Sequence, residues 1–217
     1  MRFKPRREGR HMTSNVIKLT PSAHSNAVVD WFAHKFSELH PLLQDLHRNG
    51  GQLHGTVQIE IPTGVVGLLG RRLAKKLGVP TTNSSPKLDV SISHTDGLLH
   101  WHRTFDDNMQ MRSIFKPVGN MDAGYWLEDT GPLELKLTVD ILDGGWYWRC
   151  LSMRLWKIPL PLWLFPHSKA YKKIEGDKYR FYVSFSLLGL GTILSYSGLL
   201  DAHTAYQPIC ALTKPPE

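Results

Sequence analysis

The segment Leu99-His100-Trp101-His102-Arg103-Thr104-Phe105 alternates as a β-strand does, and it sets Trp101, Arg103 and Phe105 on one face. The residues before it, Lys87 to His94, have the same period of two. The two stretches meet at Asp96-Gly97, a strong signal for a tight hairpin turn. The sequence therefore predicts an antiparallel hairpin with one apolar face.

The same alternation continues on both sides of this hairpin. We count about eight predicted strands between residues 52 and 200, mostly linked by short turns, which implies antiparallel neighbours. The run from Ile158 to Pro166 contains prolines that cannot donate to a ladder, so we expect an extended crossing segment there. The predicted fold class is α+β and mainly β. We expect a curved antiparallel sheet or open barrel, with helices packed against one side or mouth.

Two helices are predicted. The first begins after a cap at Ser25 or Asn26, runs from Ala27 to about His47 with a break at Pro41, and ends at Asn49-Gly50-Gly51. The second is short and amphipathic, lies between Gly64 and Gly78, and has a basic outer face. Its predicted inner face consists of four residues: Val66, Leu69, Leu73 and Leu77. Such a helix can lie on an anionic membrane, but its length favours ordinary docking on the domain.

Composition and charge indicate one globular domain, which we place at residues 26–203, between a basic flexible tail (1–25) and a loose C-terminal tail (204–217). The formal net charge is +7, and more than half of it comes from five basic residues and one acidic residue before Met12. That distribution argues against specific nucleic-acid binding by the domain. Either Met1 or Met12 is the true start of the chain.

Targeting and redox signals are weak. Neither Cys150 nor Cys210 belongs to a CxxC pair, and no apolar run resembles a signal peptide. The longest apolar stretch, Ile158 to Phe165, is too short to span a bilayer. We therefore expect a cytoplasmic protein without a transmembrane segment.

Several short motifs, taken in order, resemble a bacterial domain of unknown function numbered 4166. The resemblance spans roughly Trp31 to Leu200. It rests on these pieces: Pro41-Leu-Leu, Trp101-His-Arg-Thr-Phe, Met111-Arg-Ser, Leu127-Glu-Asp-Thr-Gly131, Ile158-Pro-Leu-Pro161 with Pro166, and Tyr196-Ser-Gly-Leu199. In that family the domain also occurs behind a nucleotide-binding oxidoreductase-like domain, so the resemblance implies an oxidoreductase partner. This chain has no Rossmann fingerprint, and no redox cofactor carries over.

Arg103 and Glu128 are the strongest candidates for a binding site. Both lie within predicted strands among aromatic neighbours, and if both point inward they can pair. One interpretation is an Arg that binds a ligand carboxylate or phosphate, oriented by Glu128. The simpler interpretation is a structural ion pair. Trp101, Phe105 and Tyr196 complete the predicted ligand-binding set as pocket walls or core.

Other chemistry is less well supported. His94, His100 and His102 could form a metal site if they converge, but a solvated histidine patch is the simpler interpretation. No GxSxG motif or paired carboxylates point to catalysis. We therefore assign no catalytic residue, metal or cofactor.

Three hypotheses for function follow. The first is a β-rich cup that binds a small apolar or amphipathic anion, because a barrel of about eight strands can hold one small ligand. The second is an enzyme or accessory domain that works with the oxidoreductase partner. The third is a purely structural or interaction domain.

Overall fold

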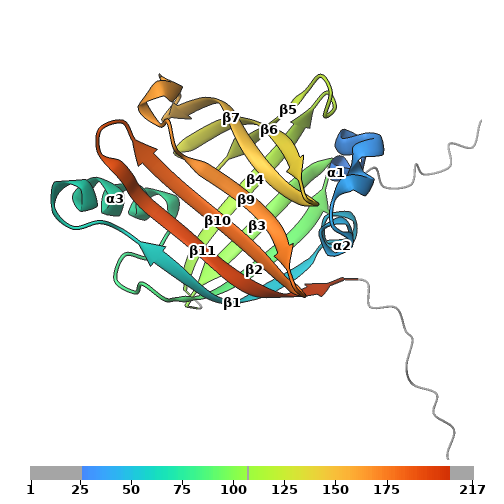
Figure 1. The fold of residues 1–217 in the computed structure, drawn as a ribbon, viewed down its shortest axis with the longest axis horizontal. Helices are drawn as coiled ribbons and strands as arrows, with labels where there is room; N and C mark the ends of the chain where they lie inside the picture. Colours follow the sequence, from blue (N-terminus) through green and yellow to red (C-terminus); the bar gives the residue numbers. More distant parts are fainter. Residues whose placement is uncertain (1–25, 107, 206–217) are drawn as a thin grey trace, which may run out of the picture.

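The computed structural model describes residues 26–106 and 108–205, and the predicted tail residues 1–25 and 206–217 lie outside this part of the chain. Within it, the sheet order is β6-β5-β4-β3-β2-β1-β11-β10-β9-β7-β8, every neighbouring pair is antiparallel, and an additional β6–β7 pairing closes the ring. The result is a closed barrel with helices at both ends (Figure 1). The strands are β1 (Gly51–Glu60), β2 (Lys87–Thr95), β3 (Leu98–Phe105), β4 (Met109–Val118), β5 (Tyr125–Asp129), β6 (Leu133–Leu142), β7 (Gly145–Leu155), β8 (Ile158–Leu160), β9 (Lys169–Glu175), β10 (Lys178–Leu187) and β11 (Gly191–Thr204).

The mainly β class and the antiparallel order are confirmed, but the predicted number of strands was slightly low. Eleven strands are present in the described residues, and ten of them close the barrel because β8 pairs only with the end of β7. The sheet is closed rather than open. Thr204, predicted to begin the C-terminal tail, still pairs with Gly51 at the end of β11.

Tight turns join the strands as the sequence indicated. Asp96 and Gly97 have φ angles of 53° and 72°, and Asp143 and Gly144 have φ angles of 49° and 73°. Positive φ at both central residues is the pattern of the hairpin turns whose twist matches that of the strands. The Asp96-Gly97 turn fixes the register in which Val90 pairs with Arg103 and Ile92 pairs with Trp101.

The N-terminal helical region covers one end of the barrel. It is not one helix up to Pro41, as predicted. It consists of α1 (Ala27–Phe32), the 3-10 helix η1 (Ala33–Glu38) and α2 (Pro41–Asn49). Asn26 caps α1, and the first break comes at Ala33, whose φ is 50°. The break lets α1 and α2 turn their apolar sides, with Trp31, Phe32 and Leu46, into the barrel end (Figure 1).

Helix α3 (Gly64–Leu77) lies at the opposite end of the barrel and ends at Gly78, as predicted (Figure 1). Of the four residues predicted to face inward, Leu77 is buried and Val66 and Leu73 pack partly buried against the core, but Leu69 is 37% exposed. The buried residues are Gly67, Gly70, Ala74 and Leu77. A Cβ atom on Gly70 would lie 1.9 Å from the carbonyl oxygen of Ile193, so glycine is what lets the helix backbone approach β11.

No helix in the described part of the chain is long and apolar enough to cross a membrane.

The close approach of α3 to β11 gives a stability prediction. Helix propensity alone would make Gly70→Ala stabilising by about 1 kcal/mol. The clash with the Ile193 carbonyl should win, because a backbone atom cannot rotate away, and we expect a net loss of about 1–3 kcal/mol. Urea denaturation measures the change. Val65→Ala, at a highly exposed position of the same helix, is the control, and equal stability of Gly70→Ala and wild type would contradict the proposed contact.

Candidate functional site

The end of the barrel beneath α1 and α2 is filled with aromatic side chains. Trp31 packs against Trp126, with ring centroids 5.4 Å apart, and Phe32 packs edge-on against Trp146 at 4.6 Å. His47 of α2 lies 4.8 Å from the ring of Trp146 and is fully buried. Burial lowers the pKa of His47 well below its usual range, so this plug carries a neutral imidazole.

The other half of the barrel interior contains a cavity of about 130 Å³. Most of its wall is apolar, but Arg103, Glu128, Lys172 and Tyr179 point into it. The apolar wall residues are Leu77, Trp101, Met111, Phe115, Leu133, Leu135, Leu137, Trp148, Met153, Phe181, Val183 and Phe185. An apolar cavity with a few converging polar groups is the usual form of a small-molecule site.

Arg103 and Glu128 both face the interior, as the prediction required, but they are linked through Ser113. Nη1 of Arg103 donates a hydrogen bond to Oγ of Ser113 at 2.9 Å, and the guanidinium carbon lies 5.1 Å from the centre of the Trp101 ring. Among the described residues, no Arg103 nitrogen lies within 4.0 Å of a Glu128 oxygen, so the predicted direct ion pair is replaced by this bridge.

Burial raises the pKa of the Glu128 carboxyl. The positive charge of Arg103, the hydrogen bond with Ser113 and the charge of Lys172 oppose this rise, but desolvation is the largest effect. Glu128 thus holds a proton at a higher pH than an exposed glutamate does.

Lys172 is the residue at this site that the sequence did not reveal. It is only 3% exposed, and its Nζ atom lies 3.5 Å, 4.6 Å and 5.7 Å from the ring centres of Trp146, Trp101 and Trp148. Burial lowers the pKa of its ammonium group well below the usual range. The charge of Arg103 lowers it further, against the raising effect of Glu128. In the part of the chain that the structure describes, its amine has aromatic neighbours but no hydrogen-bonding side chain.

Two tyrosines complete the polar lining. The hydroxyl of Tyr179 is buried and has no hydrogen-bond partner among the described residues, and burial raises the pKa of Tyr179 well above its usual range. Burial also raises the pKa of Tyr196. This residue lies on β11 and pairs with Ile59 of β1 and with Val183 of β10. Buried polar groups are normally paired, so an unpartnered hydroxyl lining a cavity indicates a binding surface.

Four of the five predicted ligand-binding residues line the cavity: Trp101, Arg103, Glu128 and Tyr196. They come from β3, β5 and β11, and barrel closure brings them together. Phe105 is fully buried and lies outside the cavity lining, so it belongs to the core. Lys172 was missed because β9 was not recognised. A charged residue on the inward face of Lys169–Glu175 hides the alternation.

The remaining candidates do not converge on a second site. Ser93 pairs with His100 and His94 pairs with Leu99, so His94 and His100 project from opposite faces of the sheet. In residues 26–106 and 108–205, no group of three His, Cys, Asp or Glu side chains is placed to hold a metal ion. Cys150 lines the cavity, but burial raises the pKa of its thiol to about 11, so it is protonated at neutral pH.

The model of one protein family matches residues 39–200, and its description is "Domain of unknown function (DUF4166)". The chain belongs to this family. The match contains every residue that lines the cavity, so the cavity lies within the DUF4166 domain. No curated protein matches the sequence.

The buried Lys172 should reduce the stability of this DUF4166 domain at neutral pH. The pKa of lysine is about 10.4 in the unfolded chain and is lowered in the fold, so the unfolded state binds more protons between these values and stability rises with pH. Lys172→Met removes this cost at similar volume. We expect a gain of about 1 kcal/mol in the free energy of unfolding at pH 7, shrinking as the pH approaches about 10.

The adjacent Lys173 provides the matched control, because it faces outward and pairs with Glu175 at 3.0 Å. Lys173→Met should produce neither the gain nor its pH dependence. Chemical denaturation of the three proteins over a range of pH makes the comparison. A loss of stability in Lys172→Met would show that the contacts of this amine with the indole rings outweigh its desolvation.

Proposed function

We propose that this protein binds a small amphipathic anion inside the barrel, with the acid group at Arg103 and Lys172 and the apolar part along the cavity wall. One observation carries the proposal: the side chains of Arg103, Glu128 and Lys172 converge in a cavity whose wall is mostly apolar. Even with Glu128 ionised, the site lacks a negative charge when both bases are protonated. A carboxylate or phosphate supplies it.

The geometry around Arg103 and Lys172 supports an anion rather than a neutral ligand. Arg103 donates one hydrogen bond to Ser113, and a guanidinium has further donors for a bidentate contact. Lys172 has no hydrogen-bonding side chain as a neighbour in the described residues, so an anion is its natural partner. The unpartnered hydroxyl of Tyr179 can donate to the same group.

The size of the cavity limits the ligand. A volume of about 130 Å³ is below the range of drug-sized pockets, about 300–1,000 Å³. It suits a compact acid, or the acid group and first carbons of a longer chain that continues toward the mouth. A cytoplasmic location remains a prediction.

A second candidate function is catalysis, and Lys172 is the observation that favours it. Burial lowers the pKa of the Lys172 amine, and the unprotonated form of an amine is a nucleophile toward carbonyl compounds. The Lys172 nitrogen would bond to the carbonyl carbon, and the two protons of the amine would pass to the carbonyl oxygen, which leaves as water. Glu128, whose pKa burial raises, is an acid able to give a proton to that oxygen and to take one back from the nitrogen. Such chemistry would suit an accessory domain that works with an oxidoreductase partner.

The anion-binding proposal predicts a preference for an acid over the matching alcohol. Isothermal titration calorimetry should detect decanoate binding and much weaker binding of decanol. Arg103→Met should reduce decanoate affinity by about tenfold or more, because it removes a charged hydrogen-bond donor. Arg112→Met, an exposed arginine that bonds Gln110 on the outer face of β4, should bind as wild type does. Equal binding of decanol and decanoate would contradict the role of the acid group.

The catalytic alternative predicts covalent trapping at one lysine. Decanal followed by borohydride should convert an imine into a stable secondary amine, and intact-mass and peptide mass spectrometry should find it at Lys172. Lys172→Met should lose this modification, and Lys173→Met should keep it. Modification spread over exposed lysines would leave anion binding as the better description of the site.

A further inference from the structure

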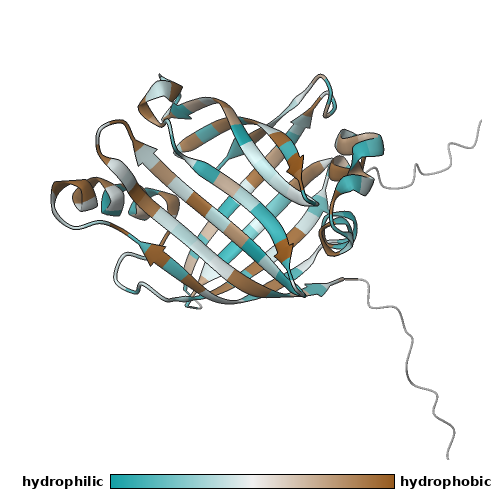
Figure 2. Ribbon diagram, viewed as in Figure 1, coloured by the Kyte–Doolittle hydropathy of each residue, from teal (hydrophilic) through white to brown (hydrophobic). Residues whose placement is uncertain are grey.

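Large apolar side chains are exposed around the α3 end of the barrel. Val65 is 78% exposed, Trp163 is 64% exposed and Ile158 is 63% exposed. We call the whole set the rim patch, and it consists of Val65, Leu68, Leu69, Trp156, Ile158, Trp163, Leu188 and Leu190. Figure 2 shows hydrophobic colouring on α3 and on the neighbouring turn between β10 and β11. Exposed apolar residues clustered in this way mark an interaction surface.

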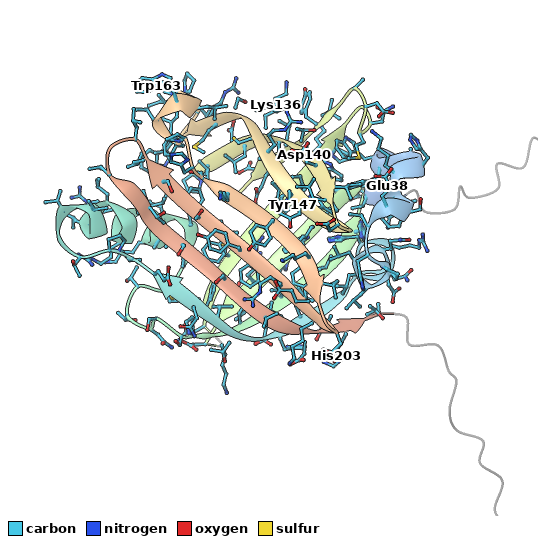
Figure 3. The ribbon with its side chains drawn as sticks, viewed as in Figure 1. Glu38, Lys136, Asp140, Tyr147, Trp163 and His203 are labelled. Carbon is cyan, nitrogen blue, oxygen red and sulfur yellow. The ribbon has the colours of Figure 1, made fainter. Side chains whose placement is uncertain are left out.

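Direct contacts connect the elements that carry the rim patch. The backbone N–H of Leu188 donates to the carbonyl of Leu164 at 2.8 Å, which joins the β10–β11 turn to the 3-10 helix η2 (Leu162–Leu164). Nζ of Lys76 lies 5.2 Å from the centre of the Trp156 ring, which joins α3 to the β7–β8 turn. The rim patch is therefore one surface at one end, and Trp163 is far from Glu38 at the helical end (Figure 3).

Basic side chains surround the rim patch. The exposed ones on α3, the β7–β8 turn and the start of β9 are Arg71, Arg72, Lys75, Lys76, Lys157 and Lys169. Among the described residues at this end, the acidic side chains of Glu60, Asp106 and Asp129 are engaged in local hydrogen bonds with Ser195, with Asn83 and the Lys87 amide, and with the Gly131 amide. Glu134 lies 3.8 Å from a guanidinium nitrogen of Arg154. Apolar groups within a basic border match the surface of an anionic bilayer.

The cavity extends to this same end. Leu77 of α3, Lys169 and Phe185 line it, and Lys169 is exposed. Here β7 leaves β9 after the Trp148–Ala170 pair and continues against β8. The cavity-lining residues Met153 and Ser168 lie on the two sides of this parting. The opposite end is closed by the aromatic plug beneath α1 and α2.

We propose that the rim patch docks on the surface of an anionic lipid bilayer, so that the mouth of the barrel faces the membrane. Trp156 and Trp163 are of the residue type that prefers the headgroup region, and the leucines, Ile158 and Val65 enter the acyl boundary. The basic border binds the anionic headgroups. This inference concerns the surface and does not require that the cavity be occupied.

Vesicle co-sedimentation tests the proposal with the full chain. The protein should sediment with phosphatidylcholine vesicles that contain phosphatidylserine and should bind pure phosphatidylcholine vesicles more weakly. Raising the salt concentration should weaken binding, because it screens the basic border. The double variant Ile158→Ser with Trp163→Ser should lower the partition coefficient by about tenfold or more.

The control is Leu142→Ser, which removes a 56% exposed apolar side chain from the helical end of the barrel, where the Gly144 carbonyl accepts from the His40 amide. It should sediment as wild type does, and so should Lys172→Met, which alters the cavity alone. Circular dichroism confirms that each variant is folded.

Two results would overturn the proposal. One is equal sedimentation of wild type and the double variant with the anionic vesicles. The other is a dimer, seen by light scattering without lipid and lost in the double variant, together with no vesicle binding, which would assign the rim patch to contact between copies of this chain. Vesicle binding by wild type and Lys172→Met without decanoate binding would leave this inference standing while rejecting the proposed ligand.

Discussion

Closure of the barrel is the constraint on which the rest of the structure depends. The β6–β7 and β1–β11 ladders satisfy the strand edges, but they also enclose a space that ten inward faces do not fill. At one end, α1 and α2 supply the missing volume with Trp31, Phe32 and His47, which pack on Trp126 and Trp146. At the other end, α3 lies at the rim and has no aromatic side chain to insert. Closure of the barrel therefore stabilises the sheet and also leaves a cavity whose floor is the aromatic cluster beneath α1 and α2.

The polar groups on that floor are costly to bury. Arg103 is compensated by Ser113 and by the face of Trp101, and Glu128 by its bond with Ser113. For Lys172, only contacts with indole rings offset the loss of hydration, and burial therefore lowers the pKa of its ammonium group in the folded protein. A core built for stability alone would place a methionine there. The proposed anion site would give this lysine a role that offsets its cost in stability, namely to receive a negative charge.

The sequence predicted those parts of the fold and site that depend on local periodicity. The alternation in Leu98–Phe105 predicts the strand and the shared face of Trp101 and Arg103, but not whether that face points into the barrel. The prediction fails where a charged residue interrupts the apolar alternation. Lys172 lies on the inward face of β9, so neither the strand nor this residue was predicted. It also fails where long-range packing decides the outcome. The glycine face of α3 is buried because β11 lies against it, and Phe105 is fully buried in the core outside the cavity lining.

Proton transfer from the ligand to Lys172 would connect the proposed anion site with the rim patch. An acid that enters the mouth as the neutral, protonated form does not carry a charge past the apolar wall. There it can give its proton to an unprotonated Lys172 amine, whose pKa burial lowers, and an ammonium–carboxylate pair then forms. The charge arises where Arg103 and the unpartnered Tyr179 hydroxyl can stabilise it. The apolar part of the ligand then points back toward the rim, the direction from which a lipid surface would supply it.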